Sequence, residues 1–472
     1  MRLPESFEDR MKAELSSLGI TEDGFFESFD KEPKKGIRFN RSKVKEDQYN
    51  KILKQIDGED IHTQVPWCDC GFYTKAESSG NSPYYHAGAI YPQEPSAMLP
   101  AQVINAKPGD VVIDLCAAPG GKACRIAEDL KGEGILIANE ISENRAKALL
   151  RNIERMGISN VVVLNEDPVN MAVPLEGVAD KIIVDAPCSG EGMFRRDPSA
   201  VKSWEKYGPY ECTKLQASIL ESADKLLKGG GELVYSTCTF GISEDEDQIL
   251  DFMSKHPEYE VIPHPGVEGV SHASGDSRLP GSMRIWPHLS EGDGRFCVHL
   301  KKRSGNVSTL LSFESRKEKL SRERDAVLRF MSGILNEKTF SEFKQKAECG
   351  LLVKGTHVSM PAVSDRSLKG LKTVKNGLYL GELKASGKEL VLVPSHSLAL
   401  TLNKDMLNPG CLLSFLSDDI NIRRYLKGET ITSEPGQKGT VVIMAEDYPL
   451  GFGKRSSDGM IKNLYPKAWR LL

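Results

Sequence analysis

Two cysteines stand in short polar motifs, each at the end of an apolar run that predicts a buried strand. The motifs are Asp185-Ala-Pro-Cys-Ser-Gly190 and Tyr235-Ser-Thr-Cys-Thr239. Neighbouring strands of a parallel sheet finish at a common edge, so Cys188 and Cys238 would project there near Asp185. Buried cysteines are usually inert packing, but a thiol at a strand end beside an acid and a glycine turn is a candidate nucleophile. The residues themselves leave open which thiol attacks.

A turn of small residues follows an earlier apolar run, in Val111-Val-Ile-Asp-Leu-Cys-Ala-Ala-Pro-Gly-Gly-Lys122. Adjacent glycines let the backbone approach a ligand closely and expose the amides at the start of a helix. The segment is not a P-loop, because Ala123 follows the Gly-Lys pair where Ser or Thr is required. It also lacks the G-x-G-x-x-G spacing of dinucleotide-binding proteins. The turn is therefore a candidate site for another kind of cofactor.

Acidic residues fall at the ends of three successive expected strands. Glu140 ends the second strand, where a carboxylate can accept two hydrogen bonds from ribose hydroxyls. Asp167 follows the third and could accept from an adenine amino group, and Asp185 follows the fourth. Each could be an ordinary loop or capping acid. Since no basic cluster is present here to neutralise a triphosphate, the set favours an adenosyl ligand without phosphates.

The scaffold for these side chains is predicted by apolar runs that alternate with helical stretches. The apolar runs cover residues 111–115, 134–139, 161–164, 181–184 and 232–235. The helical stretches cover residues 122–130, 144–155 and 212–227. This alternation is typical of an α/β fold with a parallel sheet covered by helices on both faces. Residues 295–302 predict a further strand that closes this sheet. Before the sheet, residues 66–95 predict ordered loops. After it, residues 326–347 predict a helix that precedes a β-rich C-terminal region.

Three motifs together resemble those of the Sun-type RNA cytosine-C5 methyltransferases: Asp-x-Cys-Ala-Ala-Pro-Gly-Gly-Lys, Asp-Ala-Pro-Cys-Ser-Gly and Ser-Thr-Cys-Thr. Other stretches extend the resemblance over nearly the whole chain, and it is weakest over about residues 304–350. The stretches near the C-terminus are similar to those of the bacterial RsmF-like subfamily. These stretches are Pro66-Trp-Cys68, Tyr91-Pro-Gln-Glu-Pro-Ser-Ala-Met-Leu-Pro100, Pro394-Ser-His-Ser-Leu-Ala-Leu400, Tyr448-Pro-Leu-Gly-Phe-Gly-Lys454 and Lys462-Asn-Leu-Tyr-Pro-Lys467.

The resemblance implies a Rossmann-like class I methyltransferase sheet that uses S-adenosyl-L-methionine, an N-terminal α+β subdomain and a C-terminal β-rich PUA-like barrel. We expect residues 1–95 to form an RNA-contacting subdomain and residues 96–303 the catalytic domain. Residues 304–385 would be a linker and middle subdomain, and residues 386–472 the PUA-like RNA-binding domain. The implied reaction is methylation of C5 of cytosine in ribosomal RNA, of the small subunit by the subfamily likeness.

The resemblance also implies roles for single residues. The glycine turn would cradle the methionine and ribose parts of the cofactor through Cys116, Ala117, Ala118, Pro119, Gly120, Gly121 and Lys122. Glu140 would hold the ribose, Asp167 the adenine, and Asp185 would lie between the cofactor and the target base. In this family the cysteine of the Thr-Cys motif is the nucleophile, here Cys238, and Cys188 helps to release the product. DNA-type cytosine methyltransferases use the Pro-Cys residue instead.

The chemistry sets further expectations. Burial would raise the pKa of Asp185, so that a protonated carboxyl could share a proton with N3 of the base. The target base must be unpaired or flipped out of its helix. Arg195 and Arg196 are candidate phosphate contacts. Aromatic side chains that could stack on flanking bases are Tyr84, Tyr85, Phe194, Trp204 and Tyr207. One departure from the family pattern is Gly294-Arg-Phe296, which replaces a more apolar sequence.

Composition bounds the remaining possibilities. The 472 residues are 39% hydrophobic and 27% charged, as in a multidomain globular protein, and no apolar run is long enough to cross a membrane. The N-terminus carries no apolar signal and the ten cysteines are scattered, so we expect a cytoplasmic protein that acts as a monomer and binds neither membranes nor DNA. Residues 304–472 hold 26 Lys and Arg against 18 Asp and Glu, which suits an RNA-binding module.

Two other function classes compete with this reading of the motifs. A non-catalytic RNA-binding or ribosome-assembly protein could keep this fold, but both thiol motifs are intact. A nicotinamide-dependent oxidoreductase would need the dinucleotide fingerprint that the chain lacks. Cys68 and Cys70 form a lone C-x-C pair without a second ligand pair, so we expect no metal site.

Overall fold

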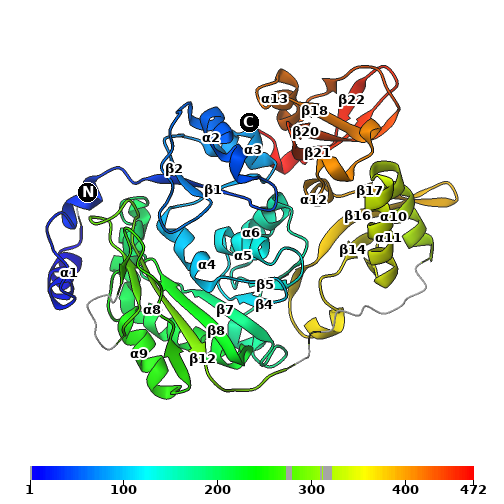
Figure 1. Cartoon of the computed structure of the whole chain (residues 1–472). Coiled ribbons are helices and arrows are strands. Elements are labelled where there is room, and N and C mark those ends of the chain that lie inside the picture. Colours follow the sequence, from blue (N-terminus) through cyan, green and yellow to red (C-terminus); the bar gives the residue numbers. More distant parts are fainter. Residues whose placement is uncertain (1–2, 273–278, 309–310, 312–320, 472) are drawn as a thin grey trace.

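The computed structural model describes residues 3–272, 279–308, 311 and 321–471. Within these residues a ten-stranded sheet forms the centre of the fold (Figure 1). Five of its strands are parallel and stand in the order β8-β7-β4-β5-β6. Their bounds are Val111–Asp114 (β4), Ile135–Asn139 (β5), Val161–Leu164 (β6), Ala179–Asp185 (β7) and Leu227–Thr237 (β8). The expected parallel α/β sheet is therefore confirmed.

Alternate residues of these strands pack into two separate hydrophobic cores, because successive side chains along a strand point to opposite faces of the sheet. Val112 and Val163 belong to the core on one face, and Ile113 and Val162 belong to the core on the other. The first face is covered by Leu99–Ile104 (α4), Gly121–Asp129 (α5) and Glu143–Met156 (α6). The second is covered by Pro168–Met171 (α7), Pro198–Leu226 (α8) and Glu246–Lys255 (α9).

Antiparallel strands extend the sheet at both edges. Arg295–Lys302 (β12) pairs with β8, as expected. Tyr259–Val261 (β9), Met283–Ile285 (β11) and Ser271–His272 (β10) continue that side. The opposite edge is completed by Thr373–Asn376 (β15), which pairs with β6. This strand lies in the range expected as a linker and middle subdomain, so the C-terminal part of the chain contributes to the catalytic sheet.

The N-terminal part carries its own small sheet. Lys35–Phe39 (β1) pairs with Gly71–Thr74 (β2) on one side and Ile90–Pro92 (β3) on the other. The segment 66–95, expected as loops, thus contains two short strands. The helices here are Glu5–Ser17 (α1), Tyr49–Asp57 (α2) and Pro83–His86 (α3).

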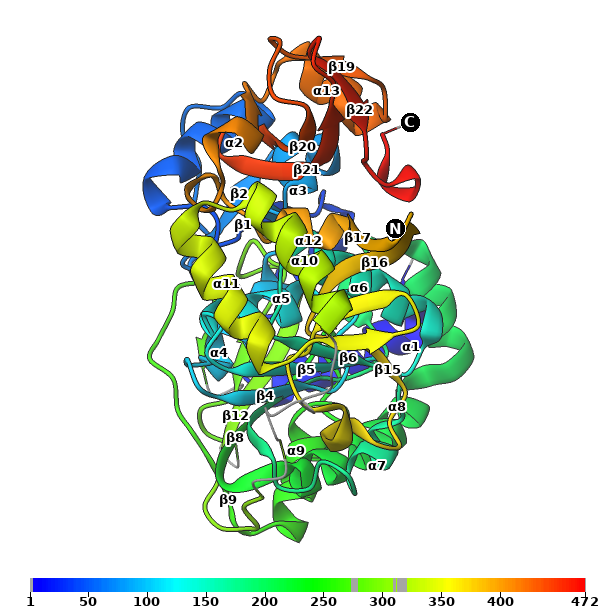
Figure 2. The same ribbon diagram turned by 90° about the vertical axis from the view of Figure 1, so that its right-hand side faces the viewer.

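Two helices replace the single one expected at 326–347: Ser321–Ile334 (α10) and Glu337–Cys349 (α11) (Figure 2). Asn336 is extended between them, and its side chain accepts a hydrogen bond from the Thr339 amide at 3.0 Å. Asn336 caps the second helix and so separates it from the first. The hydrophobic periodicity used to predict the helix does not show this break.

Two small sheets form the β-rich C-terminal region and share one core with α10. The first contains Leu352–Lys354 (β13), His357–Met360 (β14), Leu378–Ser386 (β16) and Glu389–Pro394 (β17). The second contains Leu412–Phe415 (β18), Ile431–Thr432 (β19), Gly439–Ala445 (β20), Tyr448–Arg455 (β21) and Met460–Asn463 (β22). The helices are His396–Leu400 (α12) and Ile420–Lys427 (α13). Across the described part of the chain, no helix has the length and apolar character needed to cross a membrane.

Candidate active site

The two candidate thiols meet at the carboxyl ends of β7 and β8. The sulfurs of Cys188 and Cys238 lie 3.3 Å apart, and the Cys238 amide donates to the Cys188 sulfur at 3.4 Å. The hydrogen bond between the sulfurs lowers the pKa of Cys238 and raises that of Cys188. The two thiols therefore titrate as a coupled pair, in which a thiolate is favoured at Cys238 over Cys188.

The loops that carry the thiols are fixed to each other by Glu244. Its Oε2 accepts from the Ser189 amide and from Gln216 Nε2, both at 2.9 Å. The Ser189 hydroxyl bonds to Thr239 Oγ1 at 2.8 Å, and the Gly192 amide donates to the Cys238 carbonyl at 2.9 Å. The separation of the sulfurs is thus set by the backbone around both motifs.

Asp185 lies beside the thiols with both carboxylate oxygens occupied. Oδ2 accepts from Lys122 Nζ at 2.7 Å, and Oδ1 accepts from Ser236 Oγ and Arg295 Nη1, each at 2.8 Å. Burial raises the pKa of Asp185, but the charges of Lys122 and Arg295 outweigh it and leave the pKa below its usual value. The expectation of a raised pKa and a protonated Asp185 is therefore wrong.

Arg295 is a member of this site that the sequence reasoning missed. It begins β12, and its side chain is 6% exposed. The departure at Gly294-Arg-Phe296 was the available signal, but only the pairing of β12 with β8 brings it beside Asp185, 110 residues earlier in the chain.

The glycine turn connects β4 to α5 in the expected way. Gly120 has a φ of 116° and α5 begins at Gly121. The turn carbonyls are held from α6, because Arg145 donates to the Ala118 oxygen at 2.9 Å and Asn152 to the Pro119 oxygen at 2.7 Å. A rigid turn at a strand end with a helix N-terminus behind it is the form expected of a cofactor cradle.

Acidic side chains beside this turn differ in their availability to a ligand. Glu140 is 2% exposed; its Oε1 accepts from the Ser142 amide at 2.9 Å, and its Oε2 lies 3.2 Å from Arg145 without a hydrogen bond among the described residues. A buried charged acceptor with spare capacity fits vicinal ribose hydroxyls. Asp167 is exposed and caps α7 by accepting from the Val169 amide at 2.9 Å. The structure thus brings Glu140 to the turn and leaves Asp167 at the rim.

Most other candidate RNA contacts are already engaged. Arg195 and Arg196 both pair with the carboxylate of Asp293, so neither is a free phosphate ligand. Three of the five candidate aromatic rings are buried: Tyr84, Phe194 and Trp204. Tyr85 is half-buried, and Tyr207 is 58% exposed. Of the expected stacking residues, only these last two remain accessible.

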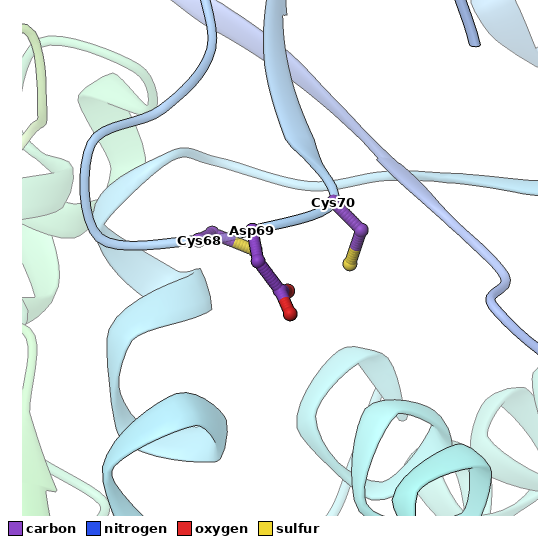
Figure 3. Close-up of side chains that lie close together, drawn as sticks. All are labelled: Cys68, Asp69 and Cys70. Carbon is purple, nitrogen blue, oxygen red and sulfur yellow. The ribbon is translucent and has the colours of Figure 1, made fainter. Parts of the chain in front are cut away.

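Cys68, Asp69 and Cys70 lie together before β2 (Figure 3). Their environment is cationic: Arg125 donates to the Cys70 sulfur at 2.7 Å and pairs with Asp69 at 3.0 Å. Arg125 thus links Cys70 and Asp69 in one polar cluster.

Family comparisons cover most of the chain. The family described as 16S rRNA methyltransferase RsmB/F matches residues 101–301, and the N-terminal domain of 16S rRNA methyltransferase RsmF matches residues 3–95. The RsmF rRNA methyltransferase first C-terminal domain matches residues 338–402, and the methyltransferase RsmF PUA domain matches residues 413–471.

Relatives and solved structures agree with these matches. Proteins named ribosomal RNA small subunit methyltransferase F are 30% identical in Vibrio vulnificus strain YJ016 (98% of this chain, 97% of the relative) and in Psychromonas ingrahamii (99% and 97%). A methyltransferase homolog from Pyrococcus horikoshii is 28% identical over 64% of this chain and 100% of its own, with a TM-score of 0.50. NSun6 from Pyrococcus horikoshii with SFG has the same fold, with a TM-score of 0.53 at 22% identity over 64% of this chain and 99% of its own. The motifs, the sheet, the C-terminal domain and these matches agree, and the chain belongs to the 16S rRNA methyltransferase RsmB/F family.

Proposed function

We propose that this methyltransferase acts on C5 of a cytosine in the RNA of the small ribosomal subunit, with Cys238 as a covalent nucleophile. The observation that carries the proposal is the pair of sulfurs 3.3 Å apart beside the Asp185 carboxylate. One proton shared by two thiols supplies what the reaction needs, a thiolate for attack and a neighbouring acid–base group.

S-adenosyl-L-methionine is the cofactor, and when bound it supplies an electrophilic methyl group. We assign its methionine and ribose parts to the turn from Cys116 to Lys122, and its ribose hydroxyls to Glu140. Oε2 of Glu140 supports this assignment, because it accepts no hydrogen bond from the residues that the structure describes. Asp167 is assigned to the adenine, at the exposed rim of the site.

C5 of cytosine is a weak nucleophile, so the base must be activated by the protein. The Cys238 thiolate adds to C6, which forms an S–C6 bond and moves the electron pair of the C5–C6 double bond towards C5. The methyl group passes to C5, which leaves S-adenosyl-L-homocysteine. The C5 proton is then removed, the C5–H electron pair restores the C5–C6 double bond, and the S–C6 bond breaks. Cys188, next to Cys238, serves as the proton relay in that second half: it gives its own proton to the departing Cys238 sulfur and takes up the C5 proton in its place.

Asp185 takes part as an ionised group. An ionised carboxylate only accepts hydrogen bonds, and Oδ2 has one protein donor, Lys122. The 4-amino group of cytosine is a donor on the edge of the base. We therefore assign Asp185 as an acceptor that orients the cytosine, in place of the proton donor expected from the sequence.

Separate substitution of the two thiols tests the proposal. When the Cys188→Ala variant is incubated with small-subunit RNA and S-adenosyl-L-methionine, protein cross-linked to RNA should accumulate. Cys238 can still add to C6 in this variant, but the covalent intermediate breaks down more slowly. Cys238→Ala should form neither adduct nor methylated RNA. A denaturing gel reads the adduct as a slow band that is sensitive to ribonuclease.

The opposite pattern would identify Cys188 as the nucleophile. Absence of adduct in both variants, at wild-type thermal stability, would remove the covalent route. Cys297→Ala is the matched control, because this buried thiol lies in the neighbouring strand β12 outside the pair. In line with this substrate we also infer a cytoplasmic enzyme that acts as a monomer.

A further inference from the structure

Arg295 reaches the active site from an unusually constrained position. Its neighbour Phe296 is the first residue of β12 that pairs with β8, opposite Thr237. Arg295 therefore lies beside Cys238, one position beyond that end of the ladder. Gly294 has a φ of 132°, and a Cβ there would lie 2.4 Å from the ring of Phe240. Because only glycine fits this turn, the backbone fixes where the Arg295 side chain begins.

The hydrogen bonding of Arg295 differs from that of a structural arginine. Arg284, on the adjacent strand β11, is equally buried and bonds to both oxygens of Glu246, at 2.9 and 2.5 Å, and to the Phe240 carbonyl at 3.1 Å. Arg295 donates to one acceptor, Asp185 Oδ1, and its buried Nε has no hydrogen-bond partner among the described residues. An unpaired buried donor costs stability, so packing alone does not account for this residue.

Arg295 and Lys122 both act on the acidic groups and thiols of the site. Two cations, Lys122 and Arg295, bind the single carboxylate of Asp185. The groups that act on the Cys238 sulfur are Cys188, Arg295, Asp185 and Lys122, and Glu94 is a further acid facing Arg295. The Arg295 charge lowers the pKa of Cys238, so removal of this charge should disfavour a thiolate there.

We propose that Arg295 is a positioning residue of the methyl-transfer site, which holds the Asp185 carboxylate and stabilises a thiolate at the neighbouring Cys238. The inference rests on the proposed function for its role in catalysis, but its effect on the thiol needs no RNA.

Alkylation of Cys238 by iodoacetamide, followed by peptide mass spectrometry across a pH series, tests the thiol in the full-length protein. Arg295→Met should move the pH midpoint of Cys238 alkylation upward by about one unit, which is about tenfold slower reaction at neutral pH. Arg295→Lys should retain most of the wild-type rate, because the charge is kept. The control is Lys301→Met, which removes a charge from the same strand, where Lys301 pairs with Glu232 at 3.2 Å.

The same variants should shift the pH profile of kcat/KM for RNA methylation in parallel. An Arg295→Met enzyme with wild-type alkylation and pH profiles would overturn the inference even if Cys238 adducts with RNA form normally. Shifted alkylation without any RNA adduct in Cys188→Ala would instead count against the proposed function alone. If Arg295→Met fails to fold, Arg295→Gln replaces it in the test, because glutamine keeps a hydrogen-bond donor for Asp185 without the charge. A wild-type pH midpoint of Cys238 alkylation in Arg295→Gln would equally overturn the inference.

Discussion

Glu140→Ala should weaken binding of S-adenosyl-L-methionine without disturbing the fold. In the structure Oε1 accepts from the Ser142 amide. Oε2 is buried and lies 3.2 Å from Arg145, but it accepts no hydrogen bond from the described residues. A hydrogen bond to a charged group contributes about 1.5–3 kcal/mol, so Kd should rise by roughly ten- to a hundredfold. Glu140→Gln should lose a similar amount, because its amide offers one acceptor and turns the other position into a donor.

Isothermal titration calorimetry with the full chain measures the effect. Glu143→Ala is the matched control, since this nearby carboxylate is 65% exposed, pairs with Lys147 and should leave Kd unchanged. Wild-type affinity in Glu140→Ala would refute the assignment of Glu140 to the ribose. Affinity lost equally in both variants would show a general effect of acidic charge near the turn.

Two further predictions concern protons and salt. Burial raises the pKa of Asp114 from 3.8 to about 7. Between these two pH values the folded chain keeps a proton that the unfolded chain releases. The free energy of unfolding should therefore fall by up to about 4 kcal/mol as the pH rises from 3.8 to about 7. Asp114→Asn should therefore melt higher than the wild type at pH 8 and equally at pH 4 in scanning calorimetry; a difference that does not change with pH would contradict this. Arg423→Ala with Lys427→Ala removes two exposed cations from α13, and should flatten the slope of log affinity against log salt for single-stranded RNA by about 1.4 while cofactor affinity is kept. An unchanged slope would place the RNA elsewhere.

The parallel sheet and the meeting of the thiols could be predicted from sequence because both are local. Each strand is an apolar run of the right length, and each cysteine follows its own strand within a few residues. Once the strands are parallel and adjacent, the convergence of Cys188 and Cys238 follows from geometry alone. The same holds for Glu140 at the end of β5.

What could not be predicted depends on contacts between distant segments. The ionisation of Asp185 is decided by Arg295, which arrives on a strand 110 residues later. The engagement of Arg195 and Arg196 depends on Asp293, about 97 residues away. No pattern within a short window encodes such pairs. The sequence-based expectations therefore gave Asp185 too high a pKa and treated Arg195 and Arg196 as available to bind phosphate.

The position of β15 has a consequence for how the chain acquires its structure. Its partner β6 is Val161–Leu164, a fully buried run of four apolar residues more than 200 positions earlier. During synthesis from the N-terminus, β6 is an open edge of the sheet until Asn376 has emerged, and open apolar edges invite pairing between molecules. A nascent chain cut short before this strand therefore keeps an open apolar edge that favours aggregation, even though every catalytic motif has already been made.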